Sequence, residues 1–166
     1  MPTDFLSVLR AFQDAQVRYV LVGGLAVLLH GVDRLTADID LIVDLAPEQA
    51  SRAIETLLAM GFRTQVPVDA RLFADPATRK RWREESSMVV LSFWDPQNRC
   101  PTVDVFAEYP MDFEKLFSAA VLMPLSGTNV RVASIQHLID IKRAAGRPRD
   151  LEDAARLAQV HEGKGP

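Results

Sequence analysis

Apolar and polar residues follow one another along the chain in short patterns typical of strands and amphipathic helices. Apolar spacing, caps and helix breakers predict helices from a Thr3 or Asp4 cap to Phe12, over 25–30, from Pro47 to Gly61, over 76–85 and 113–119, from Ser134 to about Gly146, and from Asp150 to about Ala158. Apolar runs predict strands over 19–22, 38–44, 88–94, 102–107 and 130–132. This irregular succession predicts an α+β fold, with a mixed β-sheet flanked by helices.

The chain has the length of one domain. Its 166 residues contain no repeat and no linker long enough to separate two domains. We therefore expect a single domain over 1–166, with a core over about 17–132 and a C-terminal helical part over about 134–160. No apolar run is long enough to cross a membrane, the N-terminus lacks a signal-peptide pattern, and Cys100 is the only cysteine. These features predict a cytoplasmic protein without a membrane partner.

The charge balance is slightly acidic. The chain has 19 Lys and Arg against 22 Asp and Glu, a formal net charge of -3. A protein that binds nucleic acid without sequence preference carries an excess of positive charge. The net charge therefore argues against general nucleic-acid binding, although it does not show how the charges are placed.

Asp38-Ile39-Asp40 stands inside a predicted strand. Side chains alternate between the two faces of a strand, so both carboxylates project from one face and Ile39 points to the core. Asp104 is a third carboxylate in an apolar strand, and a divalent cation such as Mg²⁺ would relieve the repulsion among the three. The alternative is structural: Asp38 ends a loop, and Asp40 and Asp104 lie on a solvated face.

Gly23-Gly24 stands where a predicted strand ends and a predicted helix begins. Backbone N–H groups at such a junction face outward, and glycine lets an anion approach them closely. A simple tight turn is the alternative interpretation. An anion-binding turn followed by metal-binding carboxylates is, however, typical of a site for a metal and a triphosphate.

The chain resembles the minimal nucleotidyltransferases at several places in the family's order. The similarity rests on Gly23-Gly24-Leu25-Ala26, His30-Gly31, Arg34, Thr36, Asp38-Ile39-Asp40-Leu41 and the later acid Asp104. It is strongest to the AbiEii-like group, many of whose members are toxins of type IV toxin–antitoxin systems. That group also carries a C-terminal lysine helix and an Arg-Asp motif, matched by Lys142 and by Arg147-Pro148-Arg149-Asp150. The similarity covers about 17–44, 102–106 and 136–155, whereas 62–100 match no known pattern.

The resemblance implies a nucleotidyltransferase (DNA polymerase beta-like) fold with C-terminal helices and a set of residue roles. Asp38, Asp40 and Asp104 would bind Mg²⁺, which Mn²⁺ can replace, and Asp104 would also help to deprotonate the attacking hydroxyl. Gly23 and Gly24 would hold the triphosphate of the NTP substrate, such as ATP. Arg34 and Thr36, directly before the acidic pair, are candidates for phosphate contacts.

Lys142 and Asp150 are further candidates. Lys142 continues the apolar stripe of its predicted helix, so it faces inward and needs an anionic partner, either phosphate or the acidic cluster. The alternative is a lysine that extends to solvent at the end of the helix. We include Lys142 among the catalytic residues and Asp150 among the nucleotide-binding residues, although Asp150 is also well placed as a helix N-cap.

The sequence favours a Mg²⁺-dependent nucleotidyltransferase that moves a nucleoside monophosphate from an NTP to a hydroxyl of tRNA, a protein or a small molecule. It is then a candidate toxin with a cognate antitoxin. The alternatives are a binding module of the same fold without catalysis and an antibiotic nucleotidyltransferase. We interpret the basic stretch Arg79–Arg83 as a solvated helix face, with Trp82 as an alternative stacking surface for RNA.

Overall fold

A computed structural model describes residues 4–163, which form two compact units. One unit contains residues 4–19 and 37–109, and the other contains residues 20–36 and 110–163. Each unit combines helices with parallel and antiparallel strand pairs, as the α+β prediction requires. The single-domain boundaries inferred from sequence stay a prediction.

The first unit is built on strands in the order β3-β4-β5-β2. Its elements are α1 (Phe5–Asp14), β2 (Asp38–Val43), α3 (Pro47–Ala59), β3 (Arg63–Thr64), the 3₁₀ helix η1 (Ala70–Ala74), α4 (Pro76–Ser86), β4 (Val90–Trp94) and β5 (Thr102–Phe106). β3, β4 and β5 pair antiparallel, and β5 pairs with β2 in parallel. The parallel register places Asp40 of β2 opposite Asp104, the middle residue of β5.

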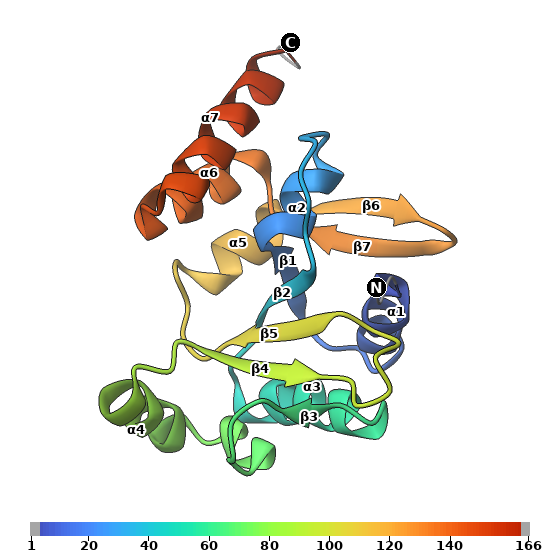
Figure 1. Ribbon diagram of the computed structural model, residues 1–166, viewed down its shortest axis with the longest axis vertical. Helices are drawn as coiled ribbons and strands as arrows, with labels where there is room; N and C mark the ends of the chain where they lie inside the picture. Colours follow the sequence, from blue (N-terminus) through green and yellow to red (C-terminus); the bar gives the residue numbers. More distant parts are fainter. Residues whose placement is uncertain (1–3, 164–166) are drawn as a thin grey trace. The chain divides into compact units, whose positions relative to one another are not determined.

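The second unit is built on strands in the order β1-β7-β6. Its elements are β1 (Tyr19–Val22, whose first residue is counted with the first unit), α2 (Gly23–Leu29), α5 (Phe113–Ala119), β6 (Val121–Leu125), β7 (Thr128–Val132), α6 (Ile135–Ala145) and α7 (Pro148–Gly163). β1 and β7 are parallel, whereas β6 and β7 form an antiparallel hairpin. α6 and α7 pack side by side (Figure 1).

The helix boundaries follow the capping signals. The Asp4 carboxylate accepts the backbone N–H of Ser7 at the start of α1, and the Ser134 hydroxyl accepts that of His137 at the start of α6. The alternative cap of α1, Thr3, lies outside the described residues. α3 begins at Pro47, as predicted, because proline suits the first helical turn.

Three short elements were not predicted from the pattern. β6 was missed because it contains Pro124 and its side chains are exposed or half-buried, without the regular alternation of a half-buried strand. Its pairing extends β7 to Thr128, two residues before the predicted start. β3, with two residues, and the single-turn η1 are too short to produce a period.

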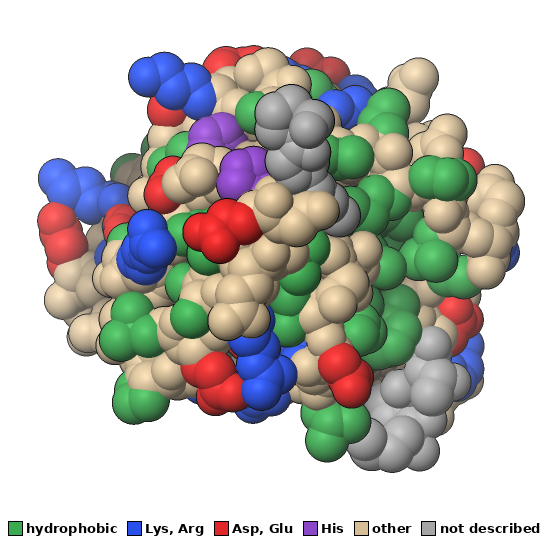
Figure 2. Space-filling view, turned by 90° about the horizontal axis from the view of Figure 1, so that it is seen from above, with side chains coloured by type: hydrophobic (Ala, Val, Ile, Leu, Met, Phe, Trp, Pro, Cys, Tyr) green, Lys and Arg blue, Asp and Glu red, His purple; other side chains and the backbone are tan. Residues whose placement is uncertain are grey.

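The described surface mixes charge signs. Lys and Arg, Asp and Glu, and hydrophobic side chains are interspersed on the face shown in Figure 2, in agreement with the nearly balanced charge of the sequence. Among residues 4–163, no helix combines the length and the apolar character needed to span a membrane.

The predicted turn between β4 and β5 is organised by Asp95. Its buried carboxylate accepts the backbone N–H groups of Gln97 (3.0 Å), Arg99 (2.9 Å) and Cys100 (3.3 Å). The hydrogen bond from the Arg99 side chain, together with these backbone bonds, holds the pKa of Asp95 well below its usual range, although burial opposes that shift. The ionised carboxylate is therefore part of the folded turn.

Replacing Asp95 should make stability less dependent on pH. A lowered pKa in the folded state stabilises the protein above the ordinary carboxyl pKa, and this stabilisation is lost as the pH falls through the folded-state pKa. We expect Asp95→Asn to reduce the free energy of unfolding at pH 7 by about 1–2 kcal/mol, because an amide accepts these N–H groups less strongly than a carboxylate. Thermal unfolding at pH 7, 5 and 3 should show the difference in Tm shrinking toward acid pH.

The exposed Asp14 at the end of α1 provides the control, since Asp14→Asn should leave the pH profile of Tm unchanged. A Tm difference between Asp95→Asn and the natural protein that stays constant from pH 7 to pH 3 would contradict the role of the ionised carboxylate.

Candidate active site

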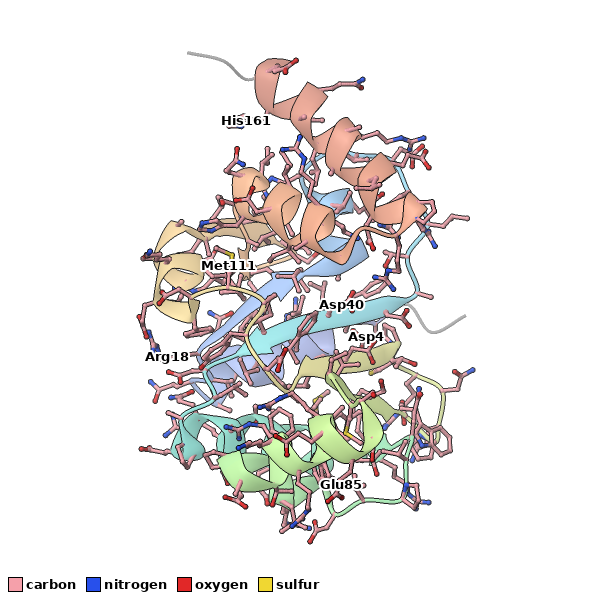
Figure 3. The ribbon with its side chains drawn as sticks, turned by 90° about the vertical axis from the view of Figure 1, so that its left-hand side faces the viewer. Asp4, Arg18, Asp40, Glu85, Met111 and His161 are labelled. Carbon is pink, nitrogen blue, oxygen red and sulfur yellow. The ribbon has the colours of Figure 1, made fainter. Side chains whose placement is uncertain are left out.

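Three carboxylates share one face of the β2–β5 pair in the first unit. The parallel register places Asp40 opposite Asp104 and Asp38 opposite Thr102. The intervening Ile39 is fully buried, so the acids project from the opposite face. Figure 3 labels Asp40 on β2. The structure therefore brings together the three acids predicted from sequence.

Asp104 is half-buried, and one of its carboxylate oxygens is shielded from water. Its Oδ1 atom is buried and, within the described chain, has no hydrogen-bond partner. Burial raises the pKa of the Asp104 carboxyl. A hydrogen bond from Ser92 lowers this pKa in part, and the negative charge of Asp38 raises it further. A buried acceptor without a hydrogen-bond partner is costly, so Oδ1 of Asp104 differs from the oxygens of an ordinary solvated face, although the residue as a whole is partly exposed. Asp38 itself is exposed, and Asp40 is half-buried.

The acidic face has the donor chemistry for a hard divalent cation. Carboxylate oxygens are the ligands that Mg²⁺ prefers, and the buried Oδ1 of Asp104 has no hydrogen-bond partner among residues 4–163. As the side chains stand, no three His, Cys, Asp or Glu groups among residues 4–163 are arranged to hold one metal ion. The residue types therefore fit a metal, and the metal site itself stays a prediction.

The Gly23-Gly24 turn in the second unit joins β1 to α2. Gly23 has φ +68°, a left-handed conformation that other residues adopt at a cost. A Cβ atom on Gly24 would lie 2.7 Å from Oγ1 of Thr36 and 3.1 Å from the guanidinium carbon of Arg34. Two side chains thus pack closely against Gly24, and the structure brings three of the predicted phosphate-contacting residues together.

The helix after the turn contributes less to anion binding than the sequence indicates. α2 has only seven residues and no side-chain cap, so its dipole offers little. Phosphate binding is supported instead by the half-buried backbone of Gly23, which no side chain covers, and by the two polar side chains packed against the buried Gly24.

Lys142 lies inside the second unit, as its place in the apolar stripe predicts. Its side chain is buried, and Nζ lies 3.0 Å from Oδ1 of Asp150 and 3.0 Å from Oδ2 of Asp153. The alternative of a lysine extending to solvent is therefore wrong. Its anionic partners are two acids of α7, and these were not the partners expected from sequence.

Asp150 is not the N-cap that the sequence offers as an alternative, because α7 begins at Pro148 and Asp150 lies within its first turn. Its buried carboxylate is bonded by Nε of Arg147 (2.6 Å) and by Lys142. Although burial opposes the shift, these two bonds hold the pKa of Asp150 below its ordinary value. Asp150 is an ionised member of a buried charge network.

Asp153 is the residue of this network that the sequence analysis missed. It pairs with Arg34 from the α2–β2 loop and with Lys142 from α6. The available signal was its position three residues after Asp150, which places the two acids on one face of a helix. Nothing in the sequence alone indicates that the same face meets Arg34.

The basic stretch Arg79–Arg83 is not simply a solvated face. Arg79 is buried, and its guanidinium donates to the carbonyl oxygens of Phe73 and Leu45 (the latter at 3.2 Å). Trp82 is also buried, so it offers no stacking surface for RNA. Both side chains hold α4 onto the first unit, which corrects the interpretation from sequence.

The chain matches a known protein family over nearly its whole length. Residues 4–166 match the family model described as nucleotidyl transferase AbiEii toxin, type IV TA system. No curated protein sequence matches the chain significantly.

Several solved structures share the fold at low sequence identity. The lincosamide antibiotic adenylyltransferase LnuA, with lincomycin bound, superposes with a TM-score of 0.62 at 16% identity, over 95% of this chain and 98% of that one. The antibiotic-resistance factor ANT(2'')-Ia gives 0.56 at 16%, over 95% and 80%. A nucleotidyltransferase-like protein of Paracoccidioides brasiliensis gives 0.57 at 15%, over 96% and 74%. At these identities, the comparison shows the fold alone.

A methyl group at Gly24 should disturb this site. Gly24→Ala places a Cβ atom inside the contact distance of Thr36 and Arg34, and such overpacking costs about 1–3 kcal/mol. We expect Tm to fall by roughly 2–4 °C per kcal/mol in a chain of this size. Calorimetry on the purified variant measures the effect.

Gly163→Ala is the matched control, since a Cβ there meets open space at the end of α7. Equal Tm values for both alanine variants would show that the packing around Gly24 is not restrictive.

Proposed function

Because the chain belongs to the AbiEii family of nucleotidyltransferase toxins, we propose that it transfers a nucleoside monophosphate from an NTP to a hydroxyl acceptor and releases pyrophosphate. Nucleotidyl transfer is the activity of the family. The observation that supports a competent enzyme is the acidic face of β2 and β5, where the buried Oδ1 of Asp104 has no hydrogen-bond partner within the described part of the chain.

We assign metal binding to Asp38, Asp40 and Asp104, with Mg²⁺ as the preferred ion and Mn²⁺ as a substitute. When bound, the metal would stabilise the charge that develops on the attacking and leaving oxygens around the α-phosphorus. The carboxylates of the first unit hold the charge that attracts such an ion. Asp104, whose Oδ1 has no hydrogen-bond partner in the described structure, is also suited to accept the proton of the attacking hydroxyl.

In the second unit, the glycine turn would contact the triphosphate. The backbone of Gly23 and Gly24 carries no side chain that could exclude a phosphate, and Arg34 and Thr36 pack against Gly24. We propose that Lys142 supplies positive charge toward the substrate, as the resemblance implies. Asp150, which binds Lys142 directly, would hold that lysine in place.

The proposal also concerns which molecule accepts the nucleoside monophosphate. Membership of a toxin family favours tRNA as the acceptor and a cognate antitoxin as the partner, and the mixed surface charge disfavours general nucleic-acid binding. A small molecule is the second candidate, because LnuA and ANT(2'')-Ia share the fold and their structures concern antibiotics.

Neutralising any of the three acids should abolish transfer. Asp38→Asn, Asp40→Asn and Asp104→Asn each remove a charged oxygen ligand, and we expect the transfer rate to fall by at least about 100-fold, the range for losing one preorganised charge in an active site. The measurement is release of pyrophosphate and labelling of total tRNA, or of small hydroxyl compounds, with each labelled NTP and Mg²⁺.

Glu85→Gln provides a matched control, because Glu85 is an exposed acid that belongs to α4 and not to β2 or β5. Labelling that persists unchanged in all three Asp→Asn variants would contradict catalysis by this face. A protein that retains its biological effect with Asp40→Asn would instead be the binding module considered from sequence.

A further inference from the structure

Asp153 occupies the centre of a buried charge network in the second unit. It is 4% exposed, its Oδ2 lies 3.0 Å from Nζ of Lys142, and the same oxygen pairs with Arg34. The two cations come from α6 and from the α2–β2 loop. A buried charge needs partners of opposite sign, so Asp153 joins two segments that are far apart in sequence.

The two acids of the network have different partners. Asp150 binds Lys142 and Arg147, both close to it in sequence. In the part of the chain that the structure describes, the Arg34 guanidinium has one carboxylate partner, Asp153. If either Asp150 or Asp153 were replaced, Lys142 would still have one carboxylate partner. Arg34 would lose its carboxylate partner only if Asp153 were replaced.

Arg34 is the member of the network that reaches the glycine turn. Its guanidinium carbon lies 3.1 Å from the position of a Cβ on Gly24, so the group rests directly against the backbone of that residue. The side chain is long and flexible, and an ion pair with a buried carboxylate restricts it to one place.

We infer that Asp153 is a positioning residue for triphosphate binding: it holds Arg34 against Gly24, so that the guanidinium meets the phosphates in a fixed place. This inference rests on the proposed function, because it takes the turn to be the triphosphate site. Asp153 of α7 thereby joins the residues that determine substrate affinity. It acts through Arg34 and does not itself contact the substrate.

Simple electrostatics gives the opposite expectation. Asp153 is negative, so its removal alone should attract a polyanion more strongly. If Asp153 positions Arg34, its removal should weaken binding instead. The sign of the change therefore separates the two effects.

The experiment measures binding of inorganic tripolyphosphate by titration calorimetry, together with Tm, for the full chain. We expect Asp153→Asn to raise Kd about tenfold and Arg34→Ala to raise it by at least as much. The double variant should bind no more weakly than Arg34→Ala, because Asp153 acts through Arg34. Tm should still fall further in the double variant, since Lys142 also loses a partner.

Two comparisons control for charge and for structure. Asp150→Asn removes the same charge from the network but keeps the pair of Arg34 with Asp153, so it should bind tripolyphosphate more tightly than Asp153→Asn. Glu152→Gln changes an exposed acid of the same helix, paired with Arg156, and should match the natural protein. If Asp153→Asn does not fold, Asp153→Glu keeps the charge but moves the carboxylate, and it should also raise Kd.

The outcomes separate this inference from the proposed function. An unchanged or lower Kd for Asp153→Asn, or additive effects in the double variant, overturns the positioning role while tripolyphosphate binding by the natural protein still supports the triphosphate site. Failure of the natural protein to bind tripolyphosphate overturns the triphosphate site and the positioning role together.

Discussion

A charge removed from water must find a partner of opposite sign, and this constraint organises both units of the chain. In the second unit it is met internally: Lys142 and Arg34 share the carboxylates of α7. In the first unit it is not met for Asp104, whose buried Oδ1 has no hydrogen-bond partner among the described residues. A network with satisfied charges is suited to hold a shape, whereas the carboxylate of Asp104 is suited to bind a cation.

The same constraint explains the charged residues that serve the fold. The buried Arg79 guanidinium is satisfied by backbone carbonyl oxygens and by the ring of Phe73. Asp95 is satisfied by backbone N–H groups of its own turn and by Arg99. Both buried charges have partners within the protein and do not need a ligand, so we assign both residues to the fold. Charged residues are therefore assigned to structure or to function by their partners, and the residue type alone does not decide.

Local signals in the sequence were sufficient for most of the secondary structure. Pro47, Ser134 and Gly146 marked helix ends because caps and breakers act within one turn. Strand periodicity placed Asp38 and Asp40 on one face and indicated the opposite face for Ile39. The signal failed for β6, where Pro124 and half-exposed side chains obscure the alternation, and for Trp82, which a basic neighbourhood made appear exposed.

The sequence by itself determined the α+β class, most element boundaries, the acidic pair of β2 and the similarity to the nucleotidyltransferases, because each depends on neighbouring residues or on a short motif. The tertiary structure decided which side chains meet. It placed Asp104 opposite Asp40 through the register of two parallel strands, and it paired Asp153 with Arg34 across 119 positions of the chain. Such pairs depend on how whole elements pack, and no local pattern carries that information.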